Sequence, residues 1–176
     1  MTRIGPFKTM RAGERAFVFP AQNNVAFLPD TKTIDGKIIR QYPVVWENSG
    51  NSPTVNLVIK TYCPNPLPLS EANPITLLPN PTTDVQRLLG QKQTTRGGAC
   101  IYSAEQLDMV RDSGYHLYIV ATENYFDIFD KHHYTETCFE LLNFSKDDKF
   151  EDVNVNPRGD VNNCGRNCAD SECDKP

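Results

Sequence analysis

Short apolar runs, separated by residues that favour turns, recur along the whole chain and predict many short strands. The run YPVVW at 42–46, for example, is followed by an Asn- and Ser-rich stretch, which is turn chemistry. The clearest pattern lies at Thr54–Tyr62, where Val55, Leu57 and Ile59 fall at every second position. A period of two is typical of a strand with one buried face, so we expect these three side chains to share that face.

Two segments carry hairpin signals. Asp35-Gly36 lies within a short run at 34–40, and this dipeptide favours a two-residue hairpin turn. The stretch Tyr115–Leu142 consists of two apolar runs around a polar centre. We predict a long hairpin there, with most of the chemically capable side chains near its turn and the other strands packed on it.

The remaining segments predict connections and little helix. Residues 63–81 contain six prolines and should form an extended connection. Asp84–Leu89 is predicted to form one helical turn. Ser103 and Gln106 have the spacing of a capping box, and Gly114 is a natural stop for the short helix that follows.

These elements predict a mainly β fold, an antiparallel immunoglobulin-like β-sandwich with one or two short helices. We expect residues 1–13 to be a leader or a non-native end, and 14–145 to be the sandwich domain. Residues 146–176 are acidic and contain cysteines. We expect them to form a tail that packs on the domain or hangs from it.

Charge and hydropathy exclude several classes of function. The 176 residues carry a net charge of −4 and no run of Lys or Arg, which argues against nucleic acid and anionic membrane surfaces as partners. No apolar run approaches the roughly 20 residues that span a bilayer. The first residues, MTRIGPFKTMRAGERAF, also lack the apolar core of a signal peptide.

The chain has six cysteines, an even number, which fits either disulfides in an oxidising compartment or thiols with a bound metal in the cytosol. They are Cys63, Cys100, Cys138, Cys164, Cys168 and Cys173. The count alone leaves both possibilities open.

The cysteines of the tail allow a zinc site as an alternative. Cys164, Cys168 and Cys173, together with His132 or His133, would supply four ligands for a tetrahedral zinc ion. Their spacing is not that of paired Cys-x-x-Cys knuckles, so we favour disulfides and expect no cofactor. One disulfide would lie within the tail, and another would join the tail to the body through Cys138 or Cys63.

The turn of the long hairpin gathers polar side chains. A three-residue loop, Asp130–His132, would place Phe129 opposite His133 and Asp127 opposite Thr135. Five residues would then share one face of the hairpin: Tyr125, Asp127, Phe129, His133 and Thr135.

This cluster has two interpretations. Tyr125, Asp127, His133 and Thr135 could form a polar recognition site at the rim of the sandwich. The same side chains could instead be a local network that fixes the turn and its register, because short polar side chains at hairpin ends commonly bond to the backbone. We favour the network and keep the four residues as the candidate binding site.

A cysteine-dependent hydrolase is a weaker hypothesis. Cys138, His133 and Asp127 are close in sequence, but positions 133 and 138 point to opposite faces of a regular strand. No glycine-rich elbow for a nucleophile is present. We therefore expect a protein that is not an enzyme.

Three short motifs resemble one group of bacterial proteins. The first is Arg15-Ala16-Phe17-Val18, and the second is the turn Asn48-Ser49-Gly50-Asn51-Ser52-Pro53-Thr54. The third is carried by Tyr125, Asp127, Phe129, His133, Thr135 and Cys138. Asp130 stands where the group usually has Gly, and Thr137 where it usually has Phe.

The group that these motifs resemble carries an N-terminal membrane segment, an Ala-rich helical stretch and then a β domain. The resemblance implies an anchor upstream of residue 1 and a domain built for contact rather than catalysis. We therefore expect a sensor or interaction module, the soluble part of a membrane-anchored bacterial protein. It would face outward from the cytoplasm, with a cytoplasmic location as the alternative.

Its ligand would be a protein or a small molecule that the sequence does not identify. Exposed sandwich edges would also allow a homo-oligomer. A zinc-stabilised or metal-sensing module is the second hypothesis for the function.

Overall fold

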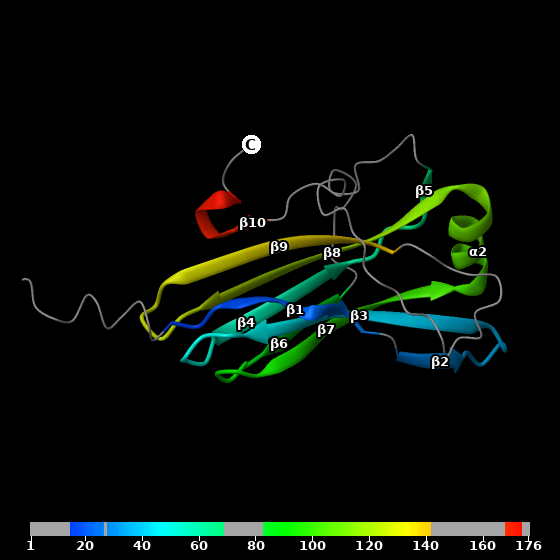
Figure 1. Cartoon of the computed structure of the whole chain (residues 1–176). Helices are drawn as coiled ribbons and strands as arrows, with labels where there is room; N and C mark the ends of the chain where they lie inside the picture. Colours follow the sequence, from blue (N-terminus) through cyan, green and yellow to red (C-terminus); the bar gives the residue numbers. More distant parts are fainter. Residues whose placement is uncertain (1–14, 27, 69–82, 142–167, 174–176) are drawn as a thin grey trace, which may run out of the picture.

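Two antiparallel sheets face each other across one core (Figure 1). The computed structural model describes residues 15–26, 28–68, 83–141 and 168–173. Most of these residues lie in strands, so the prediction of a mainly β, antiparallel fold is confirmed. The predicted leader at 1–13 lies outside the described residues, and the immunoglobulin-like topology stays a prediction.

The smaller sheet is built around one long strand, β3. Strands β1 and β2 pair with successive parts of β3 along one side, and β7 pairs along the other. Its members are β1 (Val18–Val25), β2 (Leu28–Lys32), β3 (Ile38–Asn48) and β7 (Thr94–Ser103).

The larger sheet contains the predicted hairpin at its centre. Its order is β10-β9-β8-β4-β6, and β5 also pairs with β8. Its members are β4 (Val55–Tyr62), β5 (Leu67–Pro68), β6 (Thr83–Arg87), β8 (Tyr115–Phe126), β9 (His132–Leu141) and β10 (Cys168–Ala169). Strand β10, from the predicted tail, therefore lies at the edge beside β9.

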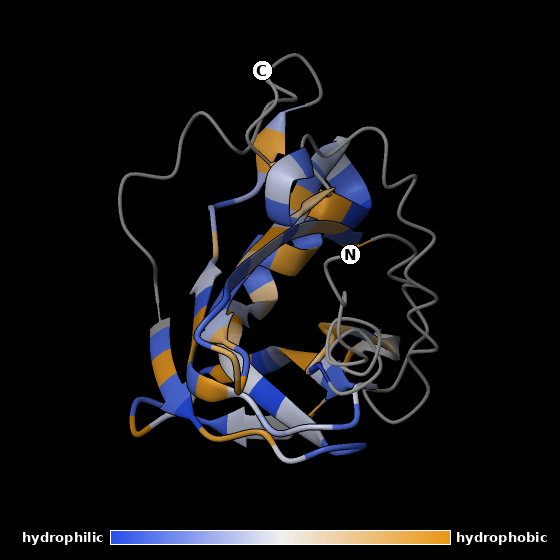
Figure 2. Ribbon diagram, turned by 90° about the vertical axis from the view of Figure 1, so that its left-hand side faces the viewer, coloured by the Kyte–Doolittle hydropathy of each residue, from blue (hydrophilic) through white to orange (hydrophobic). Residues whose placement is uncertain are grey.

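The core is formed by alternate residues of both sheets, as the banded colouring of the strands in Figure 2 illustrates. Trp46 and Tyr42 of β3 contribute its largest side chains, and Leu57 and Ile59 of β4 face them from the other sheet. Val55 was predicted to join Leu57 and Ile59, which is wrong. Asn56 has a left-handed backbone with φ of 52°, the pairing shifts there, and Val55 is left exposed.

The predicted capping box is confirmed. The Ser103 hydroxyl accepts from the backbone of Gln106, and the Gln106 side chain accepts from the backbone N–H of Ser103. Helix α2 (Ala104–Ser113) follows and ends at Gly114, which is left-handed. The helical turn predicted at Asp84–Leu89 is wrong: most of that segment is strand β6, whose pairing with β4 overrides its weak local preference.

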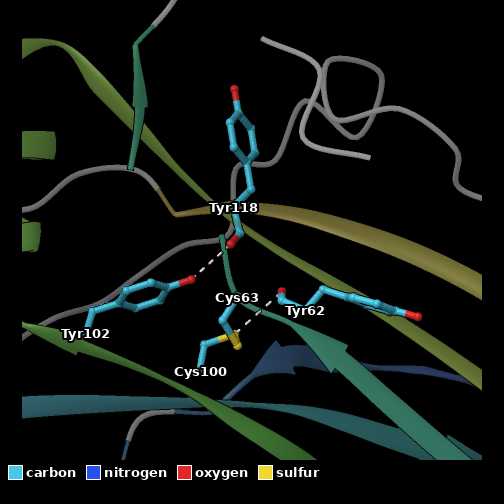
Figure 3. Close-up of a disulfide and its surroundings, with 5 residues drawn as sticks. All are labelled: Tyr62, Cys63, Cys100, Tyr102 and Tyr118. Atoms are coloured by element: carbon cyan, nitrogen blue, oxygen red, sulfur yellow. Dashed lines mark hydrogen bonds between the residues drawn. A yellow bond between two sulfur atoms is a disulfide. The ribbon is translucent and has the colours of Figure 1, made fainter. Parts of the chain in front are cut away.

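A disulfide joins the two sheets (Figure 3). Cys63, directly after β4, is bonded to Cys100 of β7. Beside it, the Tyr102 hydroxyl donates to the carbonyl oxygen of Tyr118 in β8 at 3.1 Å. A crosslink that closes a loop of this length stabilises a fold by about 2–4 kcal/mol. Disulfides of this kind persist in oxidising compartments, so this chain belongs outside the reducing cytosol.

Candidate functional site

The hairpin turn differs from the predicted three-residue loop. Tyr125 lies opposite His133, and Glu123 lies opposite Thr135. The turn therefore contains five residues, 127–131, and the predicted register is wrong. Asp127 explains the difference, because its side chain leaves the strand pattern and bonds to the turn itself.

Asp127 organises this turn with one carboxylate oxygen. Its Oδ1 accepts from the backbone N–H of Phe129 at 2.8 Å and of Lys131 at 3.0 Å. The backbone N–H of Asp127 also donates to the carbonyl of Lys131. Asp130 is left-handed, with φ of 58°, so the position where the resembling group has Gly does require that backbone conformation.

The predicted binding residues are brought together, but on the inner face of the hairpin. The two registers differ by an even number of residues, so Tyr125, His133 and Thr135 still share a face. Tyr125, Asp127 and His133 are 3%, 0% and 5% exposed, and Thr135 is half-buried. Their polar groups contact other parts of the chain, as the network interpretation expects.

His133 lies between two carboxylates. Its Nε2 is 3.3 Å from Oδ2 of Asp127, and its Nδ1 is 2.9 Å from Oδ2 of Asp170. Both contacts are hydrogen bonds when both ring nitrogens carry a proton, because a neutral imidazole donates only once. The ring also stacks on Tyr125, with centroids 4.9 Å apart.

The electrostatics of Asp127 support a structural role. Burial by itself raises the pKa of this carboxyl, but the N–H groups of Lys131 and Phe129 and the imidazole of His133 together lower it below its usual value. Arg15 adds a cation, with its Nε 3.8 Å from Oδ2. Asp127 is therefore held as a carboxylate inside the fold.

Glu123 is a member of this cluster that our sequence reasoning missed. It is fully buried, and it lies between Ile59 of β4 and Thr135 of β9. Neither carboxylate oxygen has a hydrogen-bond partner of standard geometry in the described part of the chain. Its pKa is raised to about 8. Burial is the largest cause; the Thr135 hydroxyl lowers the pKa, and the charge of Asp170 raises it. The period of two that places Tyr125 inside also places Glu123 inside.

The motifs that carry the resemblance meet at this end of the sandwich. The Tyr125 hydroxyl donates to the carbonyl of Ala16 at 3.0 Å. Asn48 is fully buried, and its Oδ1 accepts from the backbone N–H of Phe17 at 3.1 Å and of Gly50 at 3.0 Å. These motif residues therefore fix one another and the start of the sandwich.

The outer face of the same hairpin carries a hollow of about 500 Å³. Lys131 comes from the turn, and the exposed side of β9 adds three alternate side chains. The η4 turn (Asp170–Glu172) and the residue after it form another wall. The lining residues are Lys131, His132, Tyr134, Glu136, Asp170, Ser171 and Cys173.

A second disulfide shapes the wall of the hollow. Cys168 and Cys173 are bonded, and they enclose Asp170, whose backbone is left-handed with φ of 48°. Asp170 accepts from the backbone N–H of Tyr134 at 3.1 Å as well as from His133. This disulfide clip therefore connects the outer wall to the inner cluster.

Glu136 contributes a carboxylate to the lining of this hollow. The Tyr134 hydroxyl donates to its Oε2 at 2.8 Å. Its Oε1 is buried and has no hydrogen-bond partner among the residues that the structure describes. A carboxylate offers about four acceptor positions, so the bond from Tyr134 does not saturate this group.

Within the described residues, the cysteines and histidines do not assemble the alternative sites. The bond between Cys168 and Cys173 is the disulfide predicted within the tail, and it leaves no thiolate at either position. His132 and His133 point to opposite faces of β9, and Cys164 lies outside the described residues. Across 15–26, 28–68, 83–141 and 168–173, no group of three or more metal-binding side chains is present.

Cys138 is also disulfide-bonded. It packs with Tyr118 and Val120 on the outer face of the sheet, whereas His133 belongs to the inner face. The two therefore form no nucleophile and base pair of the kind that a cysteine hydrolase needs.

The chain was compared with protein-family models, with curated proteins and with solved structures, and none of these matched. The resemblance to membrane-anchored bacterial proteins therefore stays a prediction. Among the residues that the structure describes, no helix has the length and apolar character that crossing a bilayer requires.

Proposed function

We propose that this chain is an extracytoplasmic recognition domain that binds a small polar ligand in the hollow beside β9 and η4, without catalysing a reaction. The hollow carries the proposal. Donors and acceptors line it on a rigid strand, and most of its residues are accessible. Ligand sites typically enclose 300–1,000 Å³ and contain a few fixed polar groups.

Two further points support this proposal. The disulfides fit a domain exported to an oxidising compartment. The resemblance to membrane-anchored bacterial proteins adds an anchor upstream of the chain and a sensor or interaction role. The partner would then be a solute or a segment of another protein that reaches the outer surface of the domain.

The test is a backbone NMR titration of the intact, oxidised protein with a panel of monosaccharides, amino acids, tripeptides and polyamines. We expect at least one probe to shift the amides of 131–136 and 170–173, and Tyr134→Ala to weaken its binding. Ile101→Ala, an exposed change on the other sheet, should leave binding unchanged. The proposal fails if no probe moves these amides. It also fails if the protein turns over ester, peptide or sugar substrates at a site that requires Cys138.

A further inference from the structure

The charges in the hollow are separated along β9. Lys131 and His132 lie at the turn end, whereas Glu136 lies two outward positions beyond His132. Strands rise about 3.3 Å per residue, so His132 and Glu136 are about 13 Å apart along the strand. The hollow therefore has a basic end and an acidic end.

The middle of the hollow contains Tyr134 and the carboxylate of Asp170. Tyr134 lies between the two ends, with its hydroxyl bonded to Glu136. Asp170 contributes a carboxylate, but this group already bonds to His133 and to the backbone of Tyr134. Strands β8 and β10 occupy both edges of β9 at Thr135 and Glu136. At these two positions a ligand must therefore lie on the face of the strand and cannot pair with it as an added strand.

These features define the charges that a ligand should carry. A positive group would meet the carboxylate of Glu136, and a negative group would meet the ammonium group of Lys131 beside His132. The two groups must be about 7–13 Å apart, the lower value if each hydrogen bond runs along the strand and the upper value if each runs away from it. A single amino acid is too short, whereas an extended chain advances about 3.4 Å per residue, so that three residues span the gap.

Resting on the recognition role proposed above, we propose that the hollow binds a short peptide with free termini, about three residues long. Its ammonium group would lie at Glu136 and its carboxylate at Lys131 and His132, with the middle residue over Tyr134. The hollow of about 500 Å³ accommodates a ligand of this size. A neutral sugar would leave the charge separation unused, and a polyamine would place a cation against Lys131.

The test is isothermal titration calorimetry of the oxidised protein with trialanine. N-acetyl-trialanine and trialanine amide each lack one terminal charge, and free alanine is too short. We expect trialanine to bind about tenfold more tightly than any of these three, because a hydrogen bond between charged groups contributes about that factor. The capped peptides test the proposal on the unaltered protein, so it does not depend on a variant that folds.

Two variants then test which side chain binds each terminus of the peptide. Glu136→Gln should weaken the binding of trialanine about tenfold and leave N-acetyl-trialanine unchanged, since that peptide has no ammonium group. Lys131→Gln should weaken trialanine and leave trialanine amide unchanged. Glu105→Gln, an exposed change on α2, is the matched control and should change neither affinity.

Two results would overturn the peptide assignment. One is equal affinity for the free and the capped peptides, and the other is no binding of trialanine up to about 10 mM, the range of very weak ligands. If a sugar or a polyamine shifts the amides of 131–136 and trialanine does not, the peptide inference fails and the recognition role stands. If no probe reaches those amides, both fail.

Discussion

The two faces of the β8–β9 hairpin carry similar side chains and use them differently. On the inner face, His133 and Asp127 bond to each other and to the backbone. On the outer face, His132 is exposed and Glu136 is half-buried, and both line the hollow. Neighbouring residues of one strand thus differ in whether their polar groups are enclosed by the fold or lie beside the hollow.

The largest effect should come from removing the inner carboxylate. Asp127→Ala should lower the free energy of unfolding by about 4 kcal/mol, because it leaves His133 buried beside one carboxylate only and the turn without its acceptor. Urea unfolding measures this. Asp130→Asn, an exposed change in the same turn, should change stability by less than about 0.5 kcal/mol. Similar losses for the two variants would contradict the structural role of Asp127.

Asp127 also predicts a dependence on acid. Its pKa is lowered in the folded state, so its stabilising contribution is complete above about pH 4, the usual value for Asp. That contribution is lost as the pH falls through the lowered pKa. The stability of Asp127→Ala should therefore fall less steeply with acid than that of the wild type.

Glu123 should give the next largest effect, with the opposite pH dependence. Its folded pKa is raised from 4.5 to about 8, so the neutral form fits the fold and stability is lost as the pH rises through that range. Glu123→Gln removes this titration. Relative to the wild type, the variant should gain roughly 3 kcal/mol between pH 5 and pH 8.

Denaturant unfolding at a series of pH values measures this gain. Glu136→Gln, the same substitution on the outer face, is measured alongside as the matched control. A constant difference between Glu123→Gln and the wild type from pH 5 to pH 8 would mean that Glu123 is not buried as described.

The smallest expected effect is the difference in stability between two tyrosine variants. Tyr125→Phe removes the hydrogen bond to the carbonyl of Ala16, leaves that buried acceptor unpaired, and should cost about 1–2 kcal/mol. Tyr134→Phe removes the outer bond to Glu136 and should cost less than about 0.5 kcal/mol. Thermal unfolding of both variants makes the comparison. Equal costs would remove the distinction between the two faces.

Structure that depends on neighbouring residues could be predicted from the sequence. The capping box at Ser103 and the stop at Gly114 use bonds within a few positions, so both were predicted. The two strands of the main hairpin follow from their apolar pattern. Its register did not, because Asp127 has the alternation of a strand residue and only its bonds to the turn reveal that the turn is longer.

Contacts between distant segments were not predictable in this way. The pairing of Cys63 with Cys100 joins segments 37 residues apart, and six cysteines allow 15 pairings. The contact between Asp170 and His133 also spans 37 residues, with no local pattern at either end. The hollow depends on that contact, so reasoning from the hairpin alone found the inner face and missed the outer one.

The pairing of β10 with β9 also bears on what proteolysis of the chain would do to its tendency to aggregate. Cys168 and Ala169 cover the edge of β9 at Glu136 and Thr135. A bare strand edge presents unpaired N–H and C=O groups and acts as a template for aggregation. Proteolytic loss of this short segment would therefore do more than reshape a wall of the hollow. It would leave Thr135 and Glu136 without a partner on that edge of β9 and so open a place for another chain to pair.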